Sequence, residues 1–244
     1  MLKLWLLLLF VVACTPSKQG KAFSRVVATT SWTAAYARTA GADDVHVLAP
    51  LEMAHPTEYE LRPSDVAILQ QADIIIYAGY ETMMQQLQSG LDIPQSKLIS
   101  VRTEYAYNQI ESNVMKIAGV LNSDSIAKVN TLNIKALLEE GRTSLAGLPD
   151  EAVIAQFHTA ALVRELGITP KAVFGPSAPE AAEIAASAKE KVTLIIDNYH
   201  NPIGKVFREL HPEARYVQFI NFPGYGNTRT LEDVIRYNLK QLKF

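Results

Sequence analysis

The histidines are the residues of this sequence best suited to chemistry, because imidazole is both a proton-transfer group and the commonest neutral ligand of transition metals. There are 5 of them in the chain. Three follow short apolar runs that have the composition of β-strands: His55, His158 and His200. His46 lies within such a run and His211 sits in a His-Pro turn at the end of a helical pattern, so neither fits a binding site.

Further polar residues also follow predicted strands: Glu104, Asp197 and Asn221. The carboxyl ends of parallel strands lie at one edge of a sheet, and open α/β sheets bind their ligands at that edge. We therefore expect all of these candidates to lie beside one crevice.

The elements that must position these residues alternate between two kinds. Short apolar runs recur from Arg25 onward, separated by segments of helical periodicity. The runs predicted as strands are 26–30, 45–48, 73–77, 97–100, 152–157, 172–174, 192–196 and 216–220. Such alternation is typical of parallel strands joined by crossover helices. We predict an α/β fold of two small βα domains, each with a parallel four-stranded sheet.

One segment interrupts this alternation. Residues 108–147 contain no proline, and Gly119 is the one glycine before Gly141, while apolar residues recur at helical spacing. This pattern predicts one long rigid helix that joins the domains, with Asn122-Ser123-Asp124 as the point where it could break. The expected boundaries are an N-terminal βα domain at 25–107, a linking helix at 108–147 and a C-terminal βα domain at 148–244.

The N-terminus has the order of an export signal. Lys3 is followed by an apolar run from Leu4 to Val12, which is too short to span a bilayer, so residues 1–13 are predicted to be a signal peptide. The only cysteine, Cys14, comes next, and residues 14–24 form a polar tether. Val11-Val12-Ala13-Cys14 resembles the lipobox of bacterial lipoproteins, which implies acyl chains on Cys14 that hold the protein to a membrane, facing the periplasm or the cell exterior.

The composition argues against several function classes. With 23 Lys+Arg against 25 Asp+Glu, the chain has no positive field for a nucleic acid. No Gly-Xaa-Ser-Xaa-Gly elbow occurs, and Ser177 lies in a Gly-Pro-Ser-Ala-Pro turn, so a serine hydrolase is not favoured. No glycine-rich phosphate loop follows a predicted strand. We expect a binding protein and not an enzyme.

The stretch from His55 to Asp65, HPTEYELRPSD, together with Ala72-Asp73 and Tyr77-Ala78-Gly79, resembles the metal-binding lipoproteins of zinc and manganese ABC importers. This resemblance implies an extracytoplasmic solute-binding protein that captures a divalent transition metal between two domains and delivers it to a membrane permease. Zn²⁺ is the expected cargo and Mn²⁺ the next, and the protein is expected to be a monomer.

The same resemblance implies the metal ligands. His55 matches the first family ligand, and His158 in Gln156-Phe157-His158 matches the third. No histidine occupies the place of the second, where Glu104 is the nearest substitute. Asn221 stands where the family has an aspartate, so Asp197 or His200 would help to complete a degenerate site.

Alternative interpretations remain open from the sequence. His55 could be a surface loop histidine, Glu104 a solvated carboxylate, and His158 a structural residue at a helix start. The protein could also bind a chelated metal or an organic solute, or act as a surface adhesin. Side chains suited to such ligands are Tyr59, Tyr80, Tyr105, Tyr107, Tyr199, Tyr225, Asn198 and Asn227.

Overall fold

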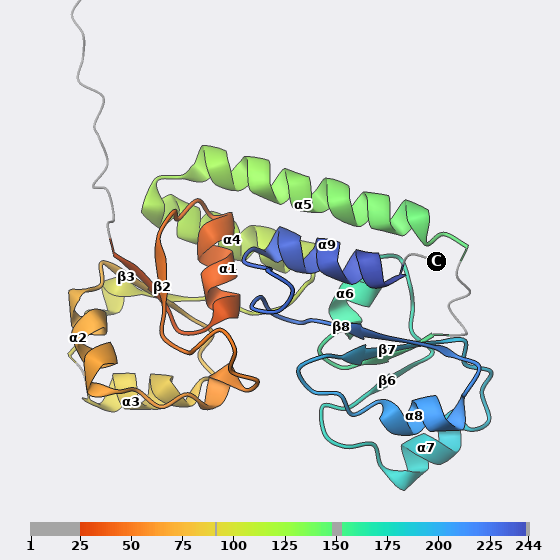
Figure 1. Ribbon diagram of the computed structural model, residues 1–244. Helices are drawn as coiled ribbons and strands as arrows, with labels where there is room; N and C mark the ends of the chain where they lie inside the picture. The colour runs from red at the N-terminus through yellow and green to blue at the C-terminus, as the bar shows by residue number, and fades with distance from the viewer. Residues whose placement is uncertain (1–24, 91, 148–152, 243–244) are drawn as a thin grey trace, which may run out of the picture.

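The computed structural model describes residues 25–90, 92–147 and 153–242, which form two lobes (Figure 1). The sheet of the first lobe has the order β2-β1-β3-β4, with β1 (Val26–Ala28), β2 (Val45–Val47), β3 (Ile74–Tyr77) and β4 (Leu98–Ser100). The sheet of the second lobe has the order β6-β5-β7-β8, with β5 (Val153–Gln156), β6 (Ala172–Phe174), β7 (Leu194–Asn198) and β8 (Arg215–Phe219). All pairings are parallel, which confirms the predicted fold class.

Strand composition explains the strand order. β1 and β3 are fully buried and read as continuous apolar runs, as expected for central strands covered on both faces. β2 pairs only with β1, and His46 on it is exposed opposite Val27. His46 therefore lies at a sheet edge, in the middle of a strand and away from the strand ends where ligands bind.

Helices cover both faces of each sheet. The first lobe carries α1 (Ser31–Thr39), α2 (Pro63–Gln71) and α3 (Thr82–Gly90), with the 3₁₀ turns η1 (Pro56–Glu58) and η2 (Gln95–Lys97). The second carries α6 (Ala160–Glu165), α7 (Ala181–Ser187), α8 (Lys205–Leu210) and α9 (Leu231–Leu242). Across the described ranges, no helix combines the length and apolarity needed to cross a bilayer.

The segment 108–147 contains two helices where a single long helix was predicted. α4 (Tyr107–Leu121) ends at Asn122, whose backbone is left-handed with φ 58° and ψ 38°, and α5 (Asp124–Ser144) then returns beside α4 (Figure 1). Asparagine tolerates this conformation better than most residues. The hydroxyl of Ser123 donates to the carbonyl of Ala40, which fixes the turn against the end of α1. The connection between the lobes is therefore a helical hairpin.

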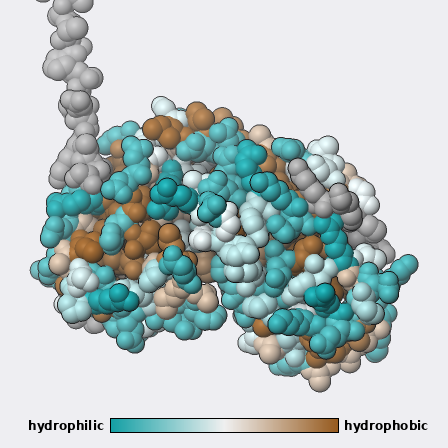
Figure 2. Space-filling view, in the orientation of Figure 1, coloured by the Kyte–Doolittle hydropathy of each residue, from teal (hydrophilic) through white to brown (hydrophobic). Residues whose placement is uncertain are grey.

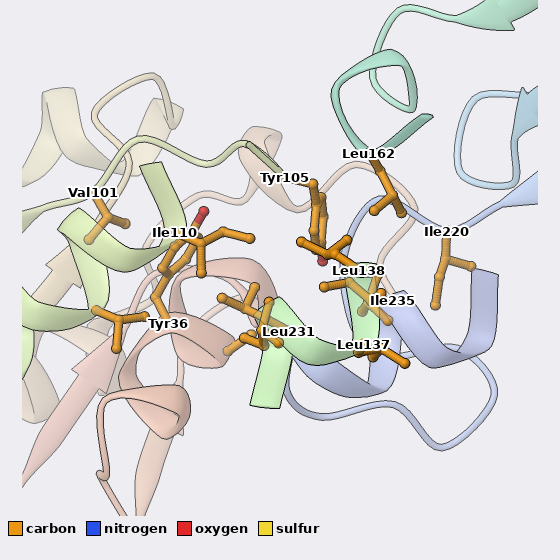
Figure 3. Close-up of a cluster of buried hydrophobic side chains, with 14 of the residues drawn as sticks. Tyr36, Val101, Tyr105, Ile110, Leu137, Leu138, Leu162, Ile220, Leu231 and Ile235 are labelled. Atoms are coloured by element: carbon orange, nitrogen blue, oxygen red, sulfur yellow. The ribbon is translucent and has the colours of Figure 1, made fainter. Parts of the chain in front are cut away.

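One continuous apolar core joins the two lobes. Figure 3 shows Tyr36 and Val101 of the first lobe in the same buried cluster as Leu162 and Ile220 of the second, with Leu137 and Leu138 of α5 among them. α9 extends this layer, since it follows the second sheet along the chain yet packs against both α5 and α1. A shared core of this kind limits lobe closure to small tilts.

Candidate functional site

A cleft of about 470 Å³ lies between the lobes, at the carboxyl ends of strands from both sheets. Figure 2 shows the surface indented between the lobes, on the side away from α5. The first lobe contributes loop residues after β1, β2, β3 and β4, and the second after β5, β7 and β8. The lining residues are Thr30, Trp32, Ala54, His55, Pro56, Thr57, Tyr80, Thr103, Phe157, His158, Asn198, His200, Asn201, Asn221 and Phe222.

The cleft is rich in imidazole, amide and aromatic groups. It brings together His55, His158, His200 and Asn221, as the strand-end argument predicted. None of the described residues that line it is acidic. The site therefore offers neutral ligands only.

His200 is the most firmly held of these side chains. Its Nδ1 lies 2.8 Å from Oδ1 of Asn221, and its ring stacks on Phe222 with the centroids 3.6 Å apart. Its backbone N–H donates to Oδ1 of the buried Asn198 at 2.9 Å. These contacts fix both the backbone and the ring plane.

The contact with Asn221 also sets the tautomer of His200. An amide oxygen can only accept, so Nδ1 carries the proton and Nε2 keeps a free lone pair for a metal. The pKa of His200 is lowered to about 4, chiefly by burial and to a smaller extent by the nearby His55, while the hydrogen bond with Asn221 acts in the opposite direction. At neutral pH the ring is therefore a neutral ligand, and Asn221 is its positioning partner.

His158 follows β5 at the mouth of the cleft. Its backbone N–H donates to Oε1 of the buried Gln156 at 2.6 Å, and its ring meets Phe157 edge-on. Desolvation lowers the pKa of His158, although the residue as a whole remains exposed. A neutral imidazole with an accessible edge is suited to bind a metal.

His55 stands at the start of η1 in the loop after β2, and it is exposed. Asp65 anchors the far end of this loop, because it accepts from the hydroxyl of Tyr59 at 2.7 Å and from the backbone N–H of Arg62 at 2.8 Å. The Tyr-Glu and Pro-Ser-Asp parts of the sequence pattern thus hold the loop, while His55 presents the functional group.

Glu104 and Asp197 do not join the histidines in the cleft. Glu104 pairs with Arg102 at 3.2 Å and lines an adjoining cavity. Asp197 is fully buried and accepts from the backbone N–H groups of Asn198 and Gly204 and from the hydroxyl of Tyr216. Burial raises the pKa of Asp197 in spite of these hydrogen bonds. The prediction that Asp197 completes a metal shell is wrong, because its carboxylate is buried inside the second lobe and is occupied by these hydrogen bonds.

Within the described residues, no three His, Cys, Asp or Glu side chains lie close enough together to hold one metal ion. The imidazoles of the two lobes therefore line one cleft, but they are too far apart to coordinate one metal ion together. For all three imidazoles to hold one metal ion, His55 and His158 would have to approach the ring of His200.

Sequence reasoning missed Glu81, which supports the first-lobe side of the cleft. Its buried carboxylate accepts from the hydroxyl of Thr29 at 2.6 Å and from the backbone N–H groups of Ala78 and Gly79 at 2.8 and 2.6 Å. Glu81 thus ties the end of β1 to the end of β3. The sequence feature that could have indicated the turn directly after β3 is Gly79. In the structure Gly79 has φ 97°, a backbone conformation that favours glycine.

Comparisons with known proteins agree with this architecture. The model of the ZnuA family, "zinc-uptake complex component A periplasmic", matches residues 26–116, which confirms the resemblance seen from His55 to Gly79. A sequence search among curated proteins found no match.

Solved structures match over most of the chain. The Mn-bound periplasmic metal binding protein of Candidatus Liberibacter asiaticus is 15% identical, with a TM-score of 0.68, and the match covers 88% of this chain and 97% of that one. The solute-binding protein FpvC of Pseudomonas aeruginosa is 17% identical in its Ni²⁺ complex, with a TM-score of 0.68 and coverage of 91% and 95%. Its Mn²⁺ complex gives a TM-score of 0.69. At this identity the likeness establishes the fold.

Proposed function

We propose that this protein is the solute-binding component of an ABC importer, which captures a divalent transition metal in the cleft and delivers it to a membrane permease. The protein binds its cargo and does not transform it. Zn²⁺ is the proposed cargo and Mn²⁺ the next candidate. The family match and the metal-bound structural relatives support this class of function.

The observation that carries the proposal is the convergence of His55, His158 and His200 on one cleft from three loops and both lobes. Nitrogen ligands favour zinc, whereas Mg²⁺ and Ca²⁺ need oxygen cages and Mn²⁺ prefers more oxygen ligands. Metal binding by imidazoles of both lobes would also bridge the lobes, so a loaded form would differ from an empty one at the surface that faces a permease.

Calorimetric titration with Zn²⁺ tests the proposal on the wild type and on His55→Ala, His158→Ala and His200→Ala. Each variant removes one of few ligands, so we expect a loss of at least about tenfold in affinity for each. His46→Ala is the matched control, because His46 is an exposed histidine outside the cleft. The proposal fails if the wild type binds no Zn²⁺, or if all three cleft variants bind it as His46→Ala does.

We also propose that the protein works outside the cytoplasm, anchored to the bacterial membrane through acyl chains on Cys14. Cys14 and the rest of the predicted signal peptide and tether lie outside the described residues. The sequence pattern of residues 1–14 and the periplasmic family match support this localisation.

A further inference from the structure

We infer that the cargo enters the cleft as a metal ion already bound to a small aromatic carboxylate, whose carboxylate group lies in the adjoining cavity against Arg164. This inference rests on the proposed function and specifies the chemical class of the cargo.

The cleft supplies too few ligands, and too little negative charge, for a metal ion alone. Three imidazoles leave a position of a tetrahedral zinc ion open, and no acidic residue among those described lines the cleft. A divalent ion held only by neutral ligands in a cleft lacks a counter-charge, which is unfavourable where the ion is removed from water. A co-ligand that carries negative charge would fill the open position and neutralise the ion.

The cleft also has room for more than a metal ion. A cleft of about 470 Å³ has the size of a small-molecule pocket and is far larger than a single ion needs. It adjoins a second cavity of about 350 Å³, since both are lined by Trp32, Thr103, Phe157 and His158. A ligand coordinated beside His158 would therefore lie next to the second cavity.

The second cavity carries more positive than negative side chains. Arg102 and Arg164 line it, together with Glu104 as its one acidic residue among those described. Arg102 is already paired with Glu104 at 3.2 Å. The guanidinium of Arg164, on α6, has no hydrogen-bond or ion-pair partner within the described residues. A planar guanidinium binds carboxylates with two parallel hydrogen bonds, so Arg164 is a ready receptor for one.

Trp32 is the aromatic residue in the lining of both cavities that a flat ligand would contact first. Trp32 lines both cavities and has Tyr105 and Phe222 as aromatic neighbours, with ring centroids 5.7 and 6.3 Å away. Its indole Nε1 is buried and has no acceptor in the described part of the chain. Buried N–H groups normally find a partner. A flat aromatic ligand would pack on Trp32, and an oxygen acceptor on it would reach Nε1 after a rotation of the indole ring that exposes this atom.

The experiment uses Zn²⁺ alone, pyridine-2-carboxylate alone and their preformed 1:1 complex as probes of the full mature chain. Native mass spectrometry detects which species bind, and calorimetry compares their affinities. We expect a ternary species of protein, zinc and carboxylate, with the complex bound about tenfold more tightly than Zn²⁺ alone, from hydrogen bonds to a charged group.

Arg164→Ala locates the carboxylate. Arg164 is exposed, so the variant should fold, and it should lose the ternary species while it keeps its affinity for Zn²⁺ alone. Arg208→Ala is the matched control, since Arg208 is an exposed arginine on α8 of the same lobe that stacks on Tyr216. A ternary species that persists in Arg164→Ala would overturn the inference.

The two proposals fail in different ways. Normal binding of Zn²⁺ alone, with no gain from the carboxylate, overturns this inference and leaves the proposed function intact. Absence of zinc binding in every form overturns both.

Discussion

His200 is held in place before any ligand arrives. Asn221 fixes the ring nitrogen, Phe222 covers one ring face, and Asn198 holds the backbone. Because the contacts that orient the ring are already made, binding a metal there needs little further ordering of this side chain. His55 and His158 have fewer such contacts, so His200 is the best organised of the three histidines.

Replacing Asn221 tests this division of roles. In Asn221→Ala the ring of His200 loses its partner and its fixed tautomer, and we expect zinc affinity to fall by about tenfold or more. In Asn221→Asp the ring keeps an acceptor, which is now charged and raises the basicity of the imidazole, so affinity should equal or exceed that of the wild type. Calorimetry with Zn²⁺ measures both.

The control for this pair is Asn133→Ala, on an exposed position of α5. If Asn221 acts only through His200, Asn221→Ala should cause no further loss of zinc affinity in the His200→Ala background, whereas loss of a separate metal ligand would weaken binding there too. Equal further losses in the wild-type and His200→Ala backgrounds would contradict the positioning role.

The sequence could place these residues but not orient them. Strand-end positions were enough to predict that His55, His158, His200 and Asn221 meet in one cleft. They could not show that Asn221 bonds to His200, or that Asp197 turns inwards to Gly204 and Tyr216. Side-chain direction depends on rotamers and on neighbours distant in sequence, which a linear pattern does not contain.

At the scale of elements, α9 begins with a well-formed cap. The carboxylate of Asp233 accepts from the backbone N–H groups of Arg229 and Thr230, both at 2.9 Å, and the hydroxyl of Thr230 accepts in return from the N–H of Asp233. Burial alone would raise the pKa of Asp233, but these hydrogen bonds lower it. The ionised carboxylate therefore stabilises the helix that packs against α5 and α1.

We predict that Asp233→Asn lowers the free energy of unfolding by about 1 kcal/mol at pH 7. A carboxyl whose pKa is depressed by folding contributes stability that is fully present above its unfolded pKa of about 3.9 and is lost as the pH falls through the folded pKa. The difference between wild type and variant should therefore shrink below about pH 4. Urea denaturation at several pH values measures it, with Asp43→Asn in an exposed loop as control.

Strands and helices could be predicted from the sequence where their apolar residues were numerous. All the predicted strands are present, because Val, Ile and Phe runs of this length are typical of buried strands. The helix α3 was not predicted, since its polar sequence carries only Met83, Met84 and Leu87 as buried anchors. The turn at Asn122 depends on the contact of Ser123 with Ala40, which is distant in sequence.

For the whole molecule, attachment to a membrane is the first property to test. Cys14→Ser removes the thiol that acyl chains would modify, so we expect the variant to leave the membrane fraction or to stall with residues 1–13 uncleaved. Fractionation and intact mass measure the two outcomes in a bacterial host. Ser17→Ala in the same tether is the control, and unchanged partitioning of Cys14→Ser would refute the anchor.

The two lobes share the continuous core shown in Figure 3, so we predict that they unfold as a single cooperative unit. Separate domains often unfold in separate steps, whereas here Leu137 and Leu138 of α5 pack in the same cluster as Val101 and Leu162. Fluorescence of Trp32, at the lobe boundary, and far-UV circular dichroism should therefore report one coincident urea transition. Two resolved transitions would contradict this. If the transition is single, a destabilising substitution in either lobe lowers the population of the assembled cleft, even when it lies far from every histidine.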